Sequence, residues 1–171
     1  MASPLSYKLY FSGNDDARDG CLIIGEDTRP VFFELDTSPG PNYAVTTTIS
    51  SDRAPVAAFD WYNSGNDFGI ATIGNRELPM AHLVMPGSCP NARTFTSADG
   101  RQYEWRRCYN DPQSYELYAQ PNVRIAYFRR FPQETPIGIS HAYFEYGFNH
   151  PLLLLEALLA LSLNRWLDWG L

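Results

Sequence analysis

The chain ends in NHPLLLLEALLALSLNRWLDWGL, residues 149–171, and this stretch decides the fold. Between residues 152 and 163 only Glu156 and Ser162 interrupt an apolar run. A run of this kind is a membrane anchor, a surface helix for a partner, or a helix buried inside the protein. Which of the three applies decides what the rest of the chain can do.

The residues of this stretch predict one helix over about residues 151–169. Leu, Ala and Glu dominate it, and all three are good helix formers. Pro151 suits a first helical turn, and Asn149 or His150 can act as the N-cap. Gly170 stands where a helix stop belongs.

The polar positions of this helix favour burial on all sides. Glu156 and the later polar residues scatter around the helix axis instead of sharing one face. The apolar stretch of 12 residues spans about 18 Å, against about 30 Å of hydrocarbon in a bilayer. A spanning helix would also immerse Arg165 and Asp168, which is costly. The sequence therefore predicts a core helix and no transmembrane segment.

The preceding part of the chain, from residue 5 to about residue 148, reads as short strands separated by turns. Gly and Pro punctuate it evenly, and "ADG" between "RTFTS" and "RQYEWRRCY" is a strong hairpin signal. About eleven or twelve strands with no linker predict a single mainly β domain over residues 1–171, built as a sandwich or barrel.

Composition narrows the class of protein further. Apolar residues make up 44% of the chain and charged residues 19%, which is the composition of a folded protein. The net charge of −6 argues against a nucleic-acid partner. The three cysteines form no CxxC pair and the start lacks a secretory signal, so we expect a cytoplasmic protein.

Residues 101–130 carry an excess of arginine in this acidic chain. The segment contains six Arg and only three acidic residues, Glu104, Asp111 and Glu116, so its net charge is +3. Strand alternation places Glu104 and Arg106 on one face of "RQYEWRRCY". In "VRIAYFRR" it places Arg124 on the face of Ala126 and Phe128.

Converging guanidinium groups could bind an anionic group, whereas the alternative is a solvated wall of Arg–Glu pairs. Aromatic side chains could likewise line a ligand cavity or simply fill the core. The candidate ligand-binding residues are Arg106, Arg124, Trp105, Tyr103 and Tyr127.

No catalytic signature is present, but separated acid–base residues can still meet in a fold. The candidates are Glu156, Glu104, His82 and Asp60. Glu156 stands on an apolar helix, so an Arg must pair with it or it is an acid of raised pKa facing a pocket. The histidines show no metal-ligand spacing, and we expect neither a metal nor a cofactor. Cys108 is either an inert thiol or activated by its Arg neighbours.

Two stretches carry a resemblance to a known family. "FTSADGRQYEWRRC", Phe95–Cys108, and "VRIAYFRR", Val123–Arg130, resemble a fungal protein family of unknown function with the tubby C-terminal-like fold. Tubby proteins, phospholipid scramblases and LURP-one-related proteins share that fold. The resemblance implies an antiparallel barrel of about twelve strands that encloses a hydrophobic C-terminal helix. It also implies a lipid-like ligand, although the features specific to scramblases are missing here.

Two functions follow from these observations. The first is a non-catalytic binding module for a lipid-like or amphipathic small molecule, with an anionic group if the arginines converge. The alternative is an enzyme acting on a hydrophobic metabolite, such as an isomerase, cyclase or pericyclic catalyst. Such reactions need only a shaped apolar pocket and a few polar groups.

Overall fold

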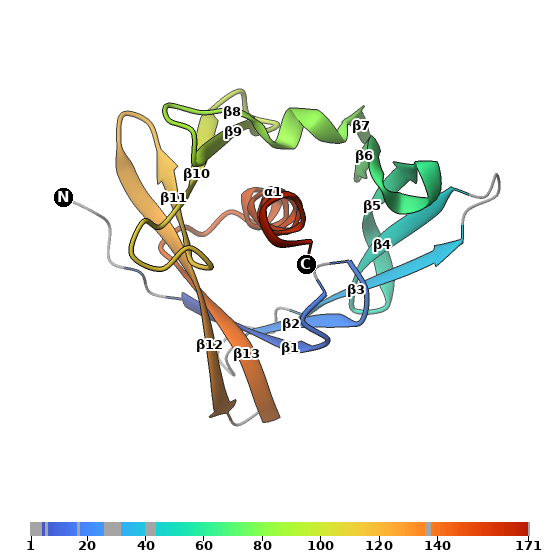
Figure 1. Ribbon diagram of the computed structural model, residues 1–171, viewed down its shortest axis with the longest axis horizontal. Coiled ribbons are helices and arrows are strands. Elements are labelled where there is room, and N and C mark those ends of the chain that lie inside the picture. Colours follow the sequence, from blue (N-terminus) through green and yellow to red (C-terminus); the bar gives the residue numbers. More distant parts are fainter. Residues whose placement is uncertain are drawn as a thin grey trace.

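In the computed structural model, one large curved sheet surrounds one helix (Figure 1). The structure describes residues 5, 7–16, 18–25, 32–39, 44–135 and 138–170. The strands are β1 (Tyr7–Gly13), β2 (Cys21–Gly25), β3 (Phe32–Pro39), β4 (Val45–Ser51), β5 (Ala54–Tyr62), β6 (Asp67–Ile73), β7 (Arg76–Pro79), β8 (Met85–Pro86), β9 (Ala92–Thr96), β10 (Gln102–Arg107), β11 (Tyr115–Ala119), β12 (Val123–Thr135) and β13 (Gly138–Tyr146). The helical elements are η1 (Asn63–Gly65), η2 (Met80–Leu83) and α1 (Pro151–Trp169).

The sheet has 13 strands in the order β7-β6-β5-β4-β3-β2-β1-β13-β12-β11-β10-β9-β8. Pairing of β1 with β13 joins the two halves of the chain, and neighbouring strands run antiparallel. The expected barrel is not closed in the described residues, because β7 and β8 are sheet edges that do not pair. Pro79 and Pro86 lack the N–H that a strand ladder needs, and η2 connects the two edges instead.

Helix α1 has the predicted bounds and the predicted caps. The His150 Nδ1 atom accepts a hydrogen bond of 3.1 Å from the Leu153 N–H. Gly170 ends the helix with a left-handed φ of 71°. Every residue from 153 to 165 is buried, and Figure 1 shows the helix in the middle of the curled sheet. No helix in the described ranges is long and apolar enough to cross a membrane.

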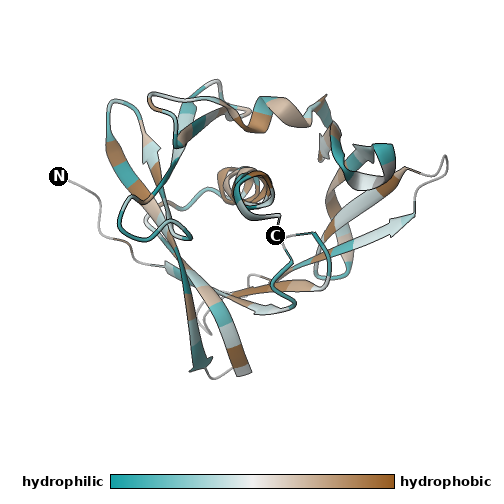
Figure 2. Cartoon of the chain, viewed as in Figure 1, coloured by the Kyte–Doolittle hydropathy of each residue, from teal (hydrophilic) through white to brown (hydrophobic). Residues whose placement is uncertain are grey.

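The space between helix and sheet is filled by side chains. Inward-facing aromatic residues such as Trp105 and Phe144 are fully buried. The Trp105 indole N–H donates to the carbonyl oxygen of Ala157 on α1 over 3.0 Å. A void of about 10 Å³ beside Leu158 and Ile49 is no larger than one water needs. Figure 2 shows the brown of hydrophobic residues on the helix and on the strands around it. The aromatic residues therefore fill the core, as one of the two alternatives predicts.

A β-bulge in β12 changes which face its first residues occupy. Leu117 pairs with Ala126 but Tyr118 pairs with Arg124, so Ile125 is an extra residue on β12. An extra residue inverts the alternation of a strand. Ala126 is fully buried whereas the Arg124 side chain is 41% exposed. The prediction that Arg124 and Ala126 share a face is therefore wrong.

Candidate ligand cleft on the outer face of the sheet

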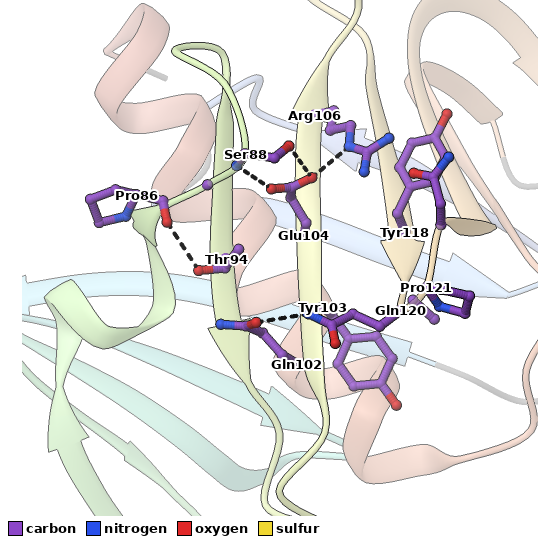
Figure 3. Close-up of a pocket in the computed structure, with 13 residues that line it drawn as sticks. Pro86, Ser88, Thr94, Gln102, Tyr103, Glu104, Arg106, Tyr118, Gln120 and Pro121 are labelled. Atoms are coloured by element: carbon purple, nitrogen blue, oxygen red, sulfur yellow. Dashed lines mark hydrogen bonds and ion pairs between the residues drawn. The ribbon is translucent and has the colours of Figure 1, made fainter.

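A cleft of about 540 Å³ lies on the outer face of the sheet over strands β8 to β11 (Figure 3). Its lining combines carboxamides, hydroxyl groups, prolines and one ion pair. The lining residues are Pro86, Gly87, Ser88, Thr94, Gln102, Tyr103, Glu104, Arg106, Tyr118, Ala119, Gln120, Pro121 and Asn122. They come from four neighbouring strands, β8 to β11, and from the turns after β8 and after β11.

Glu104 is the centre of the hydrogen-bond network in the cleft. Its Oε1 accepts a hydrogen bond of 2.6 Å from the Ser88 backbone N–H. Its Oε2 accepts from the Ser88 hydroxyl at 2.9 Å and from the Arg106 Nε at 2.6 Å. Burial acts to raise the pKa of Glu104, but the hydrogen bonds from Ser88 and Arg106 outweigh it and hold the pKa below its ordinary value. Glu104 is therefore an ionised anchor for its neighbours.

Arg106 is fixed on two sides. Its Nε is bonded to Glu104, and its guanidinium carbon lies 3.8 Å from the centre of the Tyr118 ring. Tyr118 belongs to the neighbouring strand β11, where it pairs with Glu104. Stacking on an aromatic face and a carboxylate contact restrict the plane of a guanidinium group. Arg106 is thus held in one orientation at the wall of the cleft.

The opposite rim of the cleft is built from carboxamides and small apolar residues. The Gln120 Nε2 donates to the Gln102 Oε1 over 3.0 Å, which joins the end of β11 to the start of β10. On the Glu104 side of the cleft, Gly87 lets the turn after β8 approach β9 and Glu104 closely. A Cβ added there would lie 2.7 Å from the Glu104 Oε1 and 2.6 Å from the Ala92 carbonyl oxygen, closer than carbon and oxygen normally approach.

The structure brings together some of the predicted ligand-binding residues and separates others. Tyr103 and Arg106 both line the cleft. Arg124 lies on the same outer face, where it donates to Glu116 over 2.8 Å and stands 5.9 Å from the Tyr127 ring. Arg124 and Glu116 thus form an Arg–Glu pair on the sheet beside the cleft. Trp105 faces the helix and is fully buried, so it is a core residue.

Of the predicted acid–base candidates, only Glu104 lies in the cleft. His82 is exposed on η2, and Asp60 accepts a hydrogen bond of 2.8 Å from Thr46 on the outer side of β4 and β5. Neither lines the cleft, so the four candidates do not form one constellation.

Glu156 is fully buried and has an arginine partner. Arg76 Nη1 donates to it over 3.2 Å, the Ser97 hydroxyl over 2.7 Å and the Ala98 backbone N–H over 3.1 Å. The alternative of a paired carboxylate is the one that the structure contains. Arg76 belongs to β7, whereas Ser97 and Ala98 belong to the turn after β9. One helix carboxylate therefore binds β7 on one side of the opening in the sheet and the turn after β9 on the other side.

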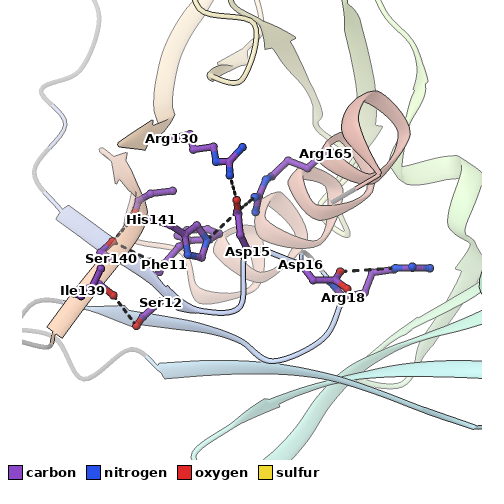
Figure 4. A network of polar contacts seen from close by, with 11 residues as sticks. Phe11, Ser12, Asp15, Asp16, Arg18, Arg130, Ile139, Ser140, His141 and Arg165 are labelled. Carbon is purple, nitrogen blue, oxygen red and sulfur yellow. Dashed lines mark hydrogen bonds and ion pairs between the residues drawn. The ribbon is translucent and has the colours of Figure 1, made fainter. Parts of the chain in front are cut away.

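A second polar network binds the other end of α1 to the sheet (Figure 4). Asp15, in the turn after β1, accepts hydrogen bonds from Arg130 and from Arg165, the latter over 2.8 Å. The His141 Nε2 lies 3.3 Å from the same carboxylate. Burial lowers the pKa of His141, which favours the neutral ring. This network holds the helix in place and lies outside the cleft.

The remaining reactive groups show no activated chemistry. Burial and the carboxylate of Glu116 raise the pKa of the Cys108 thiol to about 11. Cys108 is thus the inert thiol of the two alternatives. Among the described His, Cys, Asp and Glu side chains, no group of three could hold a metal ion.

Sequence reasoning missed several residues of the cleft. Ser88, Tyr118 and the Gln102–Gln120 pair carry no motif, and their importance comes from strand pairing. The alternation of "SYELYA" could have placed Tyr118 on an outer face, since Tyr115 and Leu117 alternate with it. The residue of β10 that lies opposite Tyr118 could not be predicted from the sequence.

The comparisons with known proteins place the chain in a family. No curated protein and no solved structure matches the chain. The model of one family matches residues 15–156, which is most of the chain and includes every strand of the cleft. The protein belongs to that family, described as a family of unknown function (DUF6593).

Proposed function

We propose that this protein is a non-catalytic binding module for a small amphipathic molecule, which occupies the outer cleft. The observation that carries the proposal is the prearranged wall formed by Glu104, Arg106 and Tyr118 in a concave site of about 540 Å³. Binding sites for small molecules have volumes of roughly 300–1,000 Å³ and a few fixed polar groups.

The lining supports an amphipathic ligand. Pro86, Pro121 and Ala119 offer apolar surface, while Gln102 and Asn122 offer polar groups. The filled interior beside α1 supports a ligand outside the sheet, in contrast to a barrel with a central cavity. The cleft suits the head of a lipid or a compact metabolite better than long acyl chains.

Two features favour binding over catalysis. Glu104 makes three hydrogen bonds that hold it ionised, so it has no proton to give near neutral pH. Glu156, the strongest acid candidate in the sequence, is bonded to Arg76 beneath the sheet and does not line the cleft. An isomerase or cyclase of the cleft would need another acid or base.

The proposed tubby-like relationship fits this reading. The tubby-like fold has a sheet that curls around a C-terminal helix, as this chain does. That resemblance implies a lipid-like ligand. The fungal origin and the superfamily assignment stay predictions.

A ligand screen tests the proposal. Amphipathic metabolites and short-chain lipids are titrated into ¹⁵N-labelled protein, and shifted amide signals are mapped on the structure. We expect binders to shift the amide signals of Ser88, Gln102 and Tyr118. The variant Tyr118→Ala should reduce the affinity of these binders by about tenfold.

The matched control is Tyr143→Ala, which removes a tyrosine that pairs with Tyr10 and Arg129 and does not line the cleft. It should leave affinity unchanged. Binders that map to another surface, or a screen with no binder, would refute the proposal.

A further inference from the structure

We infer that the cleft is specific for a hydroxylated monocarboxylic acid whose carboxylate binds the terminal nitrogens of Arg106. The inference rests on the proposed function and adds the chemical class of the ligand. It is carried by the orientation of one guanidinium group, the charges of the lining, and the amide pair on the opposite rim.

The free edge of Arg106 is the first observation. Glu104 uses the Nε edge and Tyr118 covers one face of the guanidinium plane. Among the described residues no hydrogen bond to the Arg106 Nη1 or Nη2 is present, and the side chain is 30% exposed. Two parallel N–H donors in one plane match the two oxygens of a carboxylate. Because the plane is already fixed, binding costs little side-chain entropy.

The charges of the lining select a monoanion. Arg106 is the one cation and Glu104 the one carboxylate among the lining residues, so the cleft itself has no net charge. The hydrogen bonds from Ser88 keep Glu104 ionised when a ligand arrives. A single planar negative charge can be balanced by Arg106. A phosphate dianion would bring a second charge close to the Glu104 carboxylate, without a second cation to balance it.

The opposite rim suits a body that carries hydroxyl groups. The hydrogen bond from Gln120 to Gln102 leaves the Gln102 amino group and the Gln120 carbonyl oxygen available. A donor and an acceptor side by side match hydroxyl groups, each of which donates and accepts. Pro86 and Pro121 add apolar surface for the C–H face or an aryl group of the same molecule.

Three probes of similar size test the ligand class by isothermal titration calorimetry. They are phenyl β-D-glucuronide, phenyl β-D-glucoside and glucose 6-phosphate. We expect the glucuronide to bind at least about tenfold more tightly than the glucoside, which has no carboxylate. Glucose 6-phosphate should bind more weakly than the glucuronide at pH 7.5.

Variants of Arg106 identify the group that reads the carboxylate. Arg106→Gln should reduce glucuronide affinity by about tenfold and reduce glucoside affinity much less, because only the glucuronide carries a carboxylate. Arg106→Lys keeps the charge but loses the planar fork, so it should recover only part of the affinity. Arg129→Gln is the matched control, because it removes the same charge from an exposed position on β12 outside the cleft. Thermal melting confirms that each variant is folded.

Each outcome has a defined meaning. Equal binding of glucuronide and glucoside, tighter binding of the phosphate, or no binding of any probe overturns the ligand class. An unchanged glucuronide affinity in folded Arg106→Gln and Arg106→Lys also overturns it. If neutral ligands from the library screen still map to the cleft, the proposed function survives without the inference. If no ligand of any charge maps there, both fail.

Discussion

At the residue scale, Glu156 shows how far local reasoning reaches. A carboxylate on an apolar helix must find donors, and this requirement is visible in the sequence. The identity of the donors is not, because Arg76 lies 80 positions earlier in the chain. The curvature of the sheet brings Arg76 and Ser97 to the same side of α1, and the three groups then satisfy one another.

Replacing Glu156 should destabilise the protein strongly. Glu156→Ala leaves the Ser97 hydroxyl and the Ala98 N–H without their acceptor and Arg76 without its counter-charge. Arg76 is 35% exposed and can reach water, so the main cost is the buried Ser97 hydroxyl left without an acceptor, about 1–3 kcal/mol of unfolding free energy. Urea denaturation monitored by circular dichroism measures the loss. Glu156→Gln retains an acceptor and should cost less, and equal stability of Glu156→Ala and wild type would contradict the expectation.

The three cysteines should react at very different rates. Burial raises the pKa of Cys21 to about 12, and burial with Glu116 raises the pKa of Cys108 to about 11. At pH 8 a thiol of pKa about 11 is a reactive thiolate in only about one molecule in a thousand. Cys89 is exposed. We expect one fast thiol per chain with Ellman's reagent.

The identity of that thiol is checked with Cys89→Ser, which should abolish the fast phase. The slow reaction of the folded protein should speed up as pH rises toward 11, because the thiolate fraction of Cys108 grows about tenfold per pH unit. A fast phase that persists in Cys89→Ser would contradict the raised pKa of Cys108.

At the element scale, α1 was the most readable part of the chain. Its cap, its first-turn proline and its terminal glycine all act locally, and all three occur where the sequence places them. The bulge in β12 was not readable. The sequence alternates in the same way with or without a bulge. Only the pairing of β12 with β11 reveals that Ile125 is an extra residue.

The end of α1 gives a prediction on helix termination. Gly170 has a φ of 71°, and a Cβ built there meets no atom within 4 Å. Gly170→Ala should therefore destabilise the protein by about 1 kcal/mol through backbone strain alone. Gly170→Asn should cost less, because Asn tolerates the left-handed region. Thermal unfolding of the two variants gives the comparison, and an Ala variant as stable as wild type would show that the helix ends elsewhere.

At the scale of the whole molecule, the helix and the sheet depend on each other. All strands except β8 contribute buried apolar residues to the core around α1, and the helix is buried from residue 153 to residue 165. The edges β7 and β8 do not pair in the described residues, and Glu156 links the helix to Arg76 on β7 and to Ala98 in the turn after β9.

A chain that ends at residue 148 should therefore fail to form the sheet. Loss of α1 exposes the apolar inner face and removes the contacts that hold the two edges, so hydrophobic burial no longer offsets the entropy of ordering the strands. The expected result is a non-cooperative urea titration and increased binding of a hydrophobic dye. A cooperative transition in the truncated chain would show that the sheet is stable by itself.

The sequence by itself determined the mainly β class and the bounds of α1 with its first-turn proline and terminal glycine, whereas it left open whether the aromatic residues fill the core and whether Glu156 is paired. The determined features follow from periodicity and turn chemistry, which act over a few residues. Only the tertiary structure decided that the sheet stays open at β7 and β8, that Arg124 faces outward, and that Glu104, Arg106 and Tyr118 form one wall. Those features depend on strand register and curvature, which are set by contacts between residues far apart in the chain.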